Sequence, residues 1–215
     1  MRRAGIAAAA VLLAVVIVVL GWAFPPRAAV IGTDRLGPEN GESVAEYLAF
    51  AQESLRGADT GAHWALMSLR TGIAAAQIPE YSGGLRISRA IYHVALDRVA
   101  TQVIGISLPS TPSAALASET AAAELIAATP AFTERATRTN AVVSARLRSG
   151  CACLVGLVLH GTLPELRALA ALPGVRAVEA LPADAPAAVF AVSPLLPEHG
   201  EYVKPGPDDG PVPDN

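Results

Sequence analysis

The chain has little lysine, little cysteine and few aromatic side chains for its 215 residues. Lys204 is its one lysine, and 16 basic residues face 19 acidic ones, which gives a formal net charge of -3. A chain without a basic excess lacks the electrostatic footprint that neutralises phosphates, so we expect no nucleic-acid binding. Aromatics are only 5%, and the 52% hydrophobic fraction is inflated by 44 alanines. High apolar content therefore does not by itself indicate a multi-span membrane protein.

The signatures of the common catalytic classes are also missing from the sequence. It contains no Gly-x-Ser-x-Gly elbow, no His-Glu-x-x-His pair and no Gly-x-x-x-x-Gly-Lys loop, which are the marks of hydrolases, metalloproteases and nucleotide-binding proteins. Its four histidines are scattered, and zinc prefers four clustered ligands. We therefore expect no enzymatic activity, no cofactor and no metal.

One long apolar run is present, at residues 6–24 (IAAAAVLLAVVIVVLGWAF), where 19 residues carry no charge. As a helix it would extend about 28 Å, close to the thickness of the hydrocarbon core. Arg2 and Arg3 precede it, so the positive-inside rule predicts that residues 1–5 are a cytoplasmic stub and that everything after Pro25 lies outside. The sequence thus predicts a single-pass protein of the plasma membrane.

A cleaved signal peptide is the alternative explanation of the same run. Gly21 and Ala23 have small side chains at the spacing needed for cleavage before Phe24. The run is longer than the usual core of a signal peptide, which favours the uncleaved transmembrane helix. Both hypotheses place the remaining chain outside the cytosol, and the secreted form is kept as the second. No other run of this length occurs, which excludes a multi-span transporter.

Composition divides the exported part into three regions. Residues 25–42 are rich in proline and glycine and are interpreted as a linker. Residues 43–181 carry the periodic patterns of an extracytoplasmic α+β domain. The acidic segment 182–215 holds eight prolines and cannot build a core of its own. We expect 194–204 to lie extended on the domain or on a partner, and 205–215 to stay mobile.

Hydrophobic spacing predicts the elements of the domain. A helix over 43–56 follows a capping-box pattern, Ser43 with Glu46 three residues later. The elements expected next are strands at 63–71, 86–96 and 101–108, a short helix near 73–78, and helices at 113–128 and 132–148. Glu119 and Glu124 fall on helix positions that we expect to face solvent.

The clearest unit is a strand–helix–strand crossover at 151–181. CACLVGLVLHG is a strand, Thr162 caps the helix LPELRALAAL, and Pro173 with Gly174 ends the helix before the strand VRAVEAL. Segment 63–96 repeats this order more loosely, so the fold class predicted is α+β with ferredoxin-like strand–helix–strand units. The residues expected to share one core are Val155, Leu157, Leu159, Leu166, Leu169 and Val178.

This stretch also carries a resemblance. LPELRALAALPGVRAVEALP, around 162–181, is similar to the helix–turn–strand of small ferredoxin-like and POTRA-like modules and of the propeptide domains of subtilisin-type proteases. The whole chain, with one N-terminal span, an exported domain rich in alanine and arginine, and a proline-rich tail, resembles uncharacterised single-span envelope proteins of high-GC actinobacteria. The resemblance implies a location in the cell envelope and does not imply any particular activity.

Cys151 and Cys153 are the only cysteines. In a regular strand their Cα atoms would lie about 6.7 Å apart, at the outer limit for a disulfide. A bend after Gly150 would bring them closer. A disulfide between them, two free thiols and a bridge to a partner all remain open. A redox enzyme more commonly carries Cys-x-x-Cys at a helix N-terminus, and that pattern is absent.

Two groups of residues are candidates for partner binding. The second long helix carries a basic stripe that is either a solvated face or a contact for anionic headgroups or envelope polymers: Arg135, Arg138, Arg146 and Arg148. The tail carries apolar side chains among prolines that stiffen the chain, which lowers the entropic cost of docking: Leu195, Leu196 and Tyr202.

These observations favour a non-enzymatic binding or assembly module of the cell envelope. Its expected partners are the membrane, through the N-terminal helix, and an envelope protein or polymer. The alternative is an envelope enzyme or redox protein that uses Cys151 and Cys153.

Overall fold

The computed structural model describes Leu13 and residues 34–109, 112–187 and 189–214. Within these residues no helix combines the length and the apolar character that a membrane crossing requires. The predicted transmembrane helix at 6–24 lies outside the described residues, apart from Leu13. Residues 33–215 form one compact unit, which is wider than the 43–181 domain expected from composition.

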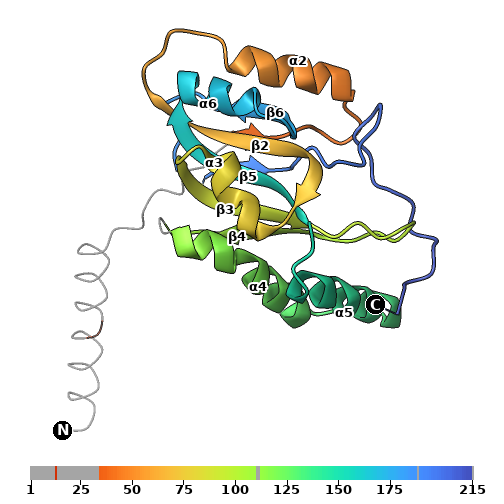
Figure 1. Ribbon diagram of the computed structural model, residues 1–215. Helices are drawn as coiled ribbons and strands as arrows, with labels where there is room; N and C mark the ends of the chain where they lie inside the picture. The colour runs from red at the N-terminus through yellow and green to blue at the C-terminus, as the bar shows by residue number, and fades with distance from the viewer. Residues whose placement is uncertain (1–12, 14–33, 110–111, 188, 215) are drawn as a thin grey trace, which may run out of the picture. The chain divides into compact units, whose positions relative to one another are not determined.

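The unit mixes α and β structure, as predicted (Figure 1). Its helices are α2 (Val44–Ser54), the 3-10 turn η1 (Ala75–Gln77), α3 (Ile78–Ser82), α4 (Pro112–Ala128), α5 (Glu134–Arg148) and α6 (Leu163–Ala170). Its strands are β1 (Arg35–Leu36), β2 (Ala62–Ile73), β3 (Arg86–His93), β4 (Val103–Ser107), β5 (Leu154–Thr162), β6 (Val175–Ala180) and β7 (Ala191–Val192). The helices and strands expected between 43 and 181 are present within a few residues of their predicted bounds.

Five strands form the main sheet in the order β4-β3-β5-β2-β6, and every neighbouring pair is antiparallel. The chain passes from β2 through η1 and α3 to β3, and β5 lies between these two strands. It passes from β5 through α6 to β6, and β2 lies between those. The sheet is therefore built from two interleaved strand–helix–strand crossovers. β4 and the pair α4 and α5 come between the crossovers in the sequence.

One face of the sheet is covered by helices α3, α4, α5 and α6. Their apolar side chains share a core with alternate residues of the strands, including Met67, Leu157 and Leu159, none of which is exposed. The predicted crossover core is confirmed for Leu166, Leu169 and Val178. Figure 1 shows α4 and α5 packed side by side along this layer.

The opposite face of the sheet is covered by the two segments that flank the predicted domain. Leu36 of β1 is fully buried against Trp64 and Leu66, and Phe190 and Leu196 pack around the same cluster. β1 and β7 pair in parallel over this face. Two-sided burial explains why β2 reads as a continuous apolar run. Residues 34–42 and 189–203 therefore belong to the packed unit.

The prediction that Val155 belongs to the crossover core was wrong. The pairing register with β3 shifts at this point: Ile91 faces Gly156 while Tyr92 faces Leu154. Such a bulge leaves one residue unpaired and breaks the alternation of side chains along the strand. Val155 consequently joins Leu66 on the opposite face, and Leu154 takes its place in the helix-covered core.

Two further expectations about side chains were wrong. Ser43 precedes α2, but its side chain makes no capping hydrogen bond; the backbone N–H of Val44 instead donates to the carbonyl of Glu201 at 2.9 Å. Glu119 is only 8% exposed, because its side of α4 faces η1. Burial raises the pKa of Glu119, against a hydrogen bond from the backbone of Ala75. Glu124 is exposed, as expected.

Candidate functional site: a groove beside the C-terminal segment

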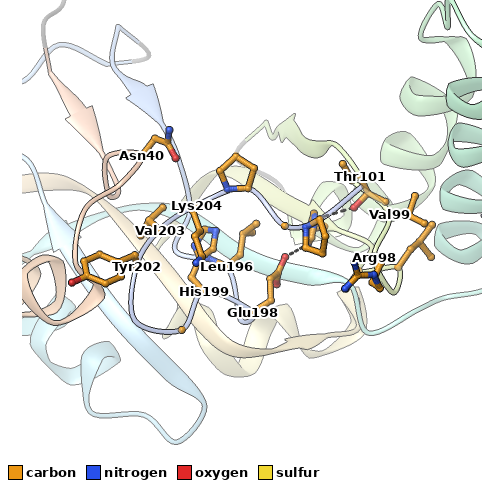
Figure 2. A pocket seen from close by; sticks show the side chains of 18 of the residues that line it. Asn40, Arg98, Val99, Thr101, Leu196, Glu198, His199, Tyr202, Val203 and Lys204 are labelled. Carbon is orange, nitrogen blue, oxygen red and sulfur yellow. Dashed lines mark hydrogen bonds and ion pairs between the residues drawn. The ribbon is translucent and has the colours of Figure 1, made fainter. Parts of the chain in front are cut away.

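A groove of about 890 Å³ lies between the β3–β4 connection and the C-terminal segment (Figure 2). The connection supplies residues 95–101 and the C-terminal segment supplies most of 193–207. Ionisable and polar side chains converge on it: His93, Asp97, Arg98, Thr101, Glu198, His199, Glu201, Tyr202 and Lys204. Concave sites with converging polar groups are the usual places where folded domains bind ligands.

The upstream wall of the groove is fixed to the domain by backbone pairing. Val203 donates to the carbonyl of Glu42 at 2.9 Å and accepts from the N–H of Gly41 at 2.6 Å. The side chain of Leu195 is fully buried in a cluster with Tyr47 and other residues of α2. The expectation that 194–204 lies against the domain is thus confirmed, but the segment is not extended throughout, because residues 197–198 form a turn.

Arg176 of β6 holds the turn at the start of this wall. Its guanidinium donates to the carbonyl oxygens of Leu196 at 2.6 Å, Pro197 at 3.3 Å and His199 at 2.5 Å. The N–H of His199 also donates to the carbonyl of Leu196, at 3.1 Å. A planar guanidinium with several donors can gather carbonyls that a lysine, as a point charge, would hold less well.

The downstream part of the segment is packed too, so the expectation of a mobile tail was wrong for 205–214. Asp208 accepts from the guanidinium of Arg135 at 2.7 Å and from the N–H of Ala100 at 3.0 Å. These two hydrogen bonds lower the pKa of Asp208. Val212 is 7% exposed and joins the helix-covered core. Figure 1 shows this segment, in blue, running from the sheet to α5.

His93 links the two walls of the groove. Its Nδ1 lies 3.0 Å from Oε1 of Glu198, and its Nε2 lies 2.9 Å from Oγ1 of Thr101. The Thr101 hydroxyl donates its single proton to the carbonyl of Val94, at 2.8 Å, because a carbonyl can only accept. Nε2 of His93 must therefore be the donor to Thr101. Nδ1 of His93 faces Oε1 of Glu198 on the other wall of the groove.

The contact with His93 affects the pKa of Glu198. Desolvation by itself would raise the pKa of Glu198, but the hydrogen bond with His93, a backbone hydrogen bond and the charges of His93 and His199 together outweigh it and lower that pKa. The Thr101 proton is committed to Val94, so Thr101 cannot give it to His93 in this arrangement. The trio of acid, imidazole and hydroxyl thus joins two segments of chain.

The two cysteines form a disulfide, which selects one of the three states left open by the sequence. Their Cα atoms are 5.2 Å apart, closer than in a regular strand, because the chain bends here and β5 begins only at Leu154. Cys153 is 8% exposed. Among the residues that the structure describes, no three His, Cys, Asp or Glu side chains are grouped to hold a metal ion.

The four arginines of the predicted basic stripe have different contacts in the structure. Arg135 and Arg138 contact the chain's own C-terminal segment, whereas Arg148 is exposed. Arg146 lies 3.4 Å from the carbonyl of Ala95. In the tail, Leu195 is buried inside the domain, while Leu196 and the 48% exposed Tyr202 line the groove.

His93 and Glu198 were not singled out together by the sequence. They lie 105 residues apart (198 minus 93), and no local spacing connects them. The one available signal was the combination of an acid and a histidine among prolines in PLLPEHG, where stiffened chain carries ionisable groups. Comparisons with family models, curated proteins and solved structures found no match for this chain.

Proposed function

We propose that this protein is a membrane-anchored, extracytoplasmic binding or assembly module of the cell envelope, without enzymatic activity. The observation that carries the proposal is the groove of about 890 Å³ with its converging polar side chains. Its best-placed hydroxyl, that of Thr101, has its proton committed to a backbone carbonyl. A site of this kind can bind a ligand through polar contacts but offers no activated nucleophile.

The proposed address rests on residues 6–24 and on Arg2 and Arg3, as argued from the sequence. The proposed fold assignment is ferredoxin-like with an insertion. The strand order β6-β2-β5-β3, with a helical crossover in each half, is the arrangement of a β-α-β-β-α-β module. In this assignment β4, α4 and α5 are the insertion.

Binding is tested with the full chain in detergent, immobilised and exposed to solubilised envelope fractions. A Gly200→Trp variant should reduce the capture of specific envelope components, because Gly200 lines the groove and a Cβ there meets nothing within 4 Å. Glu124→Trp is the control, since Glu124 is exposed and does not line the groove. Equal capture by both variants and the unmodified chain would contradict binding at the groove.

The proposed location and membrane topology are tested separately. A reporter that is active only after export, fused behind Asn215, should be active. Activity of a reporter that works only in the cytosol would contradict the proposed topology.

A redox role for Cys151 and Cys153 is the second candidate, favoured by their disulfide. It requires the pair to cycle between dithiol and disulfide with a substrate. Reduction of insulin disulfides in the presence of dithiothreitol measures this. A rate above that of a Cys151→Ser variant would support the redox role, and an equal rate would exclude it for this substrate.

A further inference from the structure

The last described residues of the chain occupy a basic surface of their own domain. Residues 205–214 (PGPDDGPVPD) contain three aspartates and no basic residue. They lie against the β3–β4 turn and α5, which supply Arg98, Arg135 and Arg138. Arg98 pairs with Asp209, Arg135 with Asp208, and Nη2 of Arg138 lies 3.7 Å from Asp214. We name these three arginines and the N–H of Ala100 the arginine surface.

The arginine surface contacts peptide backbone as well as carboxylates. Arg135 donates to the carbonyl of Gly210 at 2.9 Å, and Arg138 donates to the carbonyl of Val212 at 3.1 Å. The N–H of Gly210 donates to the carbonyl of Arg98 at 2.7 Å. Simple attraction between opposite charges needs none of these three contacts. They fix the direction and register of an extended chain, which headgroups or phosphate polymers could not reproduce.

Gly210 sets a steric requirement at the centre of this contact. A Cβ built on it would lie 2.8 Å from the carbonyl oxygen of Asp97 and 2.9 Å from that of Arg98. Backbone atoms at such distances cannot move aside cheaply. Arg98 itself has φ of 52°, a left-handed conformation uncommon outside glycine. The surface therefore distinguishes Asp-Asp-Gly from other acidic sequences.

The ion pairs of the occupied surface are nevertheless open to exchange, although release of the segment would also expose Val212, which is 7% exposed in the helix-covered core. The paired side chains are 39–54% exposed on the arginine side and 51–100% exposed on the aspartate side, and exposed ion pairs contribute little each. The prolines at 205, 207, 211 and 213 stiffen the segment, which lowers the entropic cost of binding it. A tethered ligand held by weak contacts competes mainly through its high local concentration.

We propose that the arginine surface is a docking site for extended acidic peptide segments of a partner protein, and that residues 205–214 are its resident competitor. The proposal rests on the proposed binding function and names the class of partner. Release of 205–214 would also remove the part of the groove wall formed by residues 205–207, so docking of the partner peptide and access to the groove would be coupled.

The test measures fluorescence anisotropy of a labelled synthetic peptide of residues 205–214. A chain ending at Lys204 should bind the peptide. The full chain in detergent should bind it at least about tenfold more weakly, because the resident segment competes. The full chain with Gly210→Ala should bind the peptide nearly as well as the shortened chain. The full chain with Gly206→Ala should behave as the unmodified one. Both glycines precede proline, and a Cβ at Gly206 meets nothing within 4 Å.

The same substitutions in the peptide avoid any effect on folding of the domain. The Gly210→Ala peptide should lose binding at least about tenfold, whereas the Gly206→Ala peptide should keep it, since only the first places a Cβ against backbone. Polyphosphate of matched charge should compete poorly.

Three results would overturn the proposal: no peptide binding by either the shortened chain or the Gly210→Ala chain, equal binding of the two substituted peptides, or equal competition by polyphosphate. These results are independent of the capture experiment with Gly200→Trp. A failure of the peptide site is therefore distinguishable from a failure of the binding function as a whole.

Discussion

The hydroxyl of Tyr47 donates a hydrogen bond to Oε2 of Glu179 at 2.9 Å, and both side chains are buried, 1% and 3% exposed. The same oxygen accepts from the N–H of Gly37 at 2.6 Å. One carboxylate on β6 thereby joins α2 and the segment that follows β1. The N-terminal flank of the predicted domain is fixed to the sheet through this acid.

Glu179→Ala should lower the free energy of unfolding by about 1–3 kcal/mol for each donor left unsatisfied, those of Tyr47 and Gly37. Glu179→Gln should cost less, because both donors converge on one oxygen that an amide can supply. Urea unfolding of the three proteins measures the difference. Equal losses for the two variants would contradict this role of Glu179.

The Glu179→Gln variant should also change the dependence of stability on pH. Desolvation raises the pKa of Glu179, outweighing the hydrogen bonds from Gly37 and Tyr47 and the charge of Arg35, which lower it. A raised carboxyl pKa in the folded state adds stability below its ordinary value of 4.5, and this stability is lost as the pH rises through the folded pKa. As the pH rises from 4.5 through the folded pKa of Glu179, the free energy of unfolding of the unmodified chain should fall. That of the Glu179→Gln variant should fall less.

The sequence was informative wherever a local signal sufficed. Thr162 predicted the start of α6, and in the structure Glu165 accepts from both the N–H and the hydroxyl of Thr162, at 2.8 and 2.7 Å. Ser43 and Glu46 also predicted a helix start, but the backbone of the C-terminal segment satisfies the first donor of α2 there. A helix cap supplied by a backbone carbonyl 157 residues later (201 minus 44) leaves no mark in the local sequence.

The candidate site was predictable only in part for the same reason. The arginines of α5 were visible as a stripe, and the tail was visible as acidic and proline-rich, but their mutual contact depends on how the chain returns across the sheet. The tail could not form a core of its own, and we expected residues 194–204 to lie on the domain or on a partner and 205–215 to stay mobile. In the structure its Leu195 and Val212 enter cores built by other segments.

Leu169→Ala should destabilise the protein by about 2–5 kcal/mol, since Leu169 is 4% exposed in the helix-covered core and the truncation leaves a cavity. Leu125→Ala is the control, because Leu125 is 50% exposed on α4. Denaturant unfolding compares the two. A loss below about 0.5 kcal/mol for Leu169→Ala would mean that the core around α6 is misassigned.

The disulfide between Cys151 and Cys153 should contribute only about 1–2 kcal/mol, because the loop it closes is very short. Serine at both positions should therefore leave a folded protein with a slightly lowered free energy of unfolding. Alkylation followed by mass measurement should label no cysteine before reduction and two after it. Labelling without reductant would contradict the bonded state.

Arg176→Lys should loosen the turn at 196–199, with a loss of about 1.5–3 kcal/mol when charge-assisted hydrogen bonds are removed. Chymotrypsin should then cleave at Tyr202 faster in the variant than in the unmodified chain. The isolated peptide 182–215 should be cleaved fastest of all. Equal cleavage of peptide and intact chain would show that this segment is not held on the domain.

The central claim is that the chain is an envelope binding module whose groove receives a partner. Photo-crosslinking in living cells tests this claim most directly. Benzoylphenylalanine replaces Tyr202, which lines the groove and is 48% exposed, or Phe132, an aromatic control that is 96% exposed and does not line it. Irradiation should give a defined adduct with an envelope protein from position 202 and none of that mass from position 132. The same adducts from both positions, or adducts only with cytosolic proteins, would contradict the account.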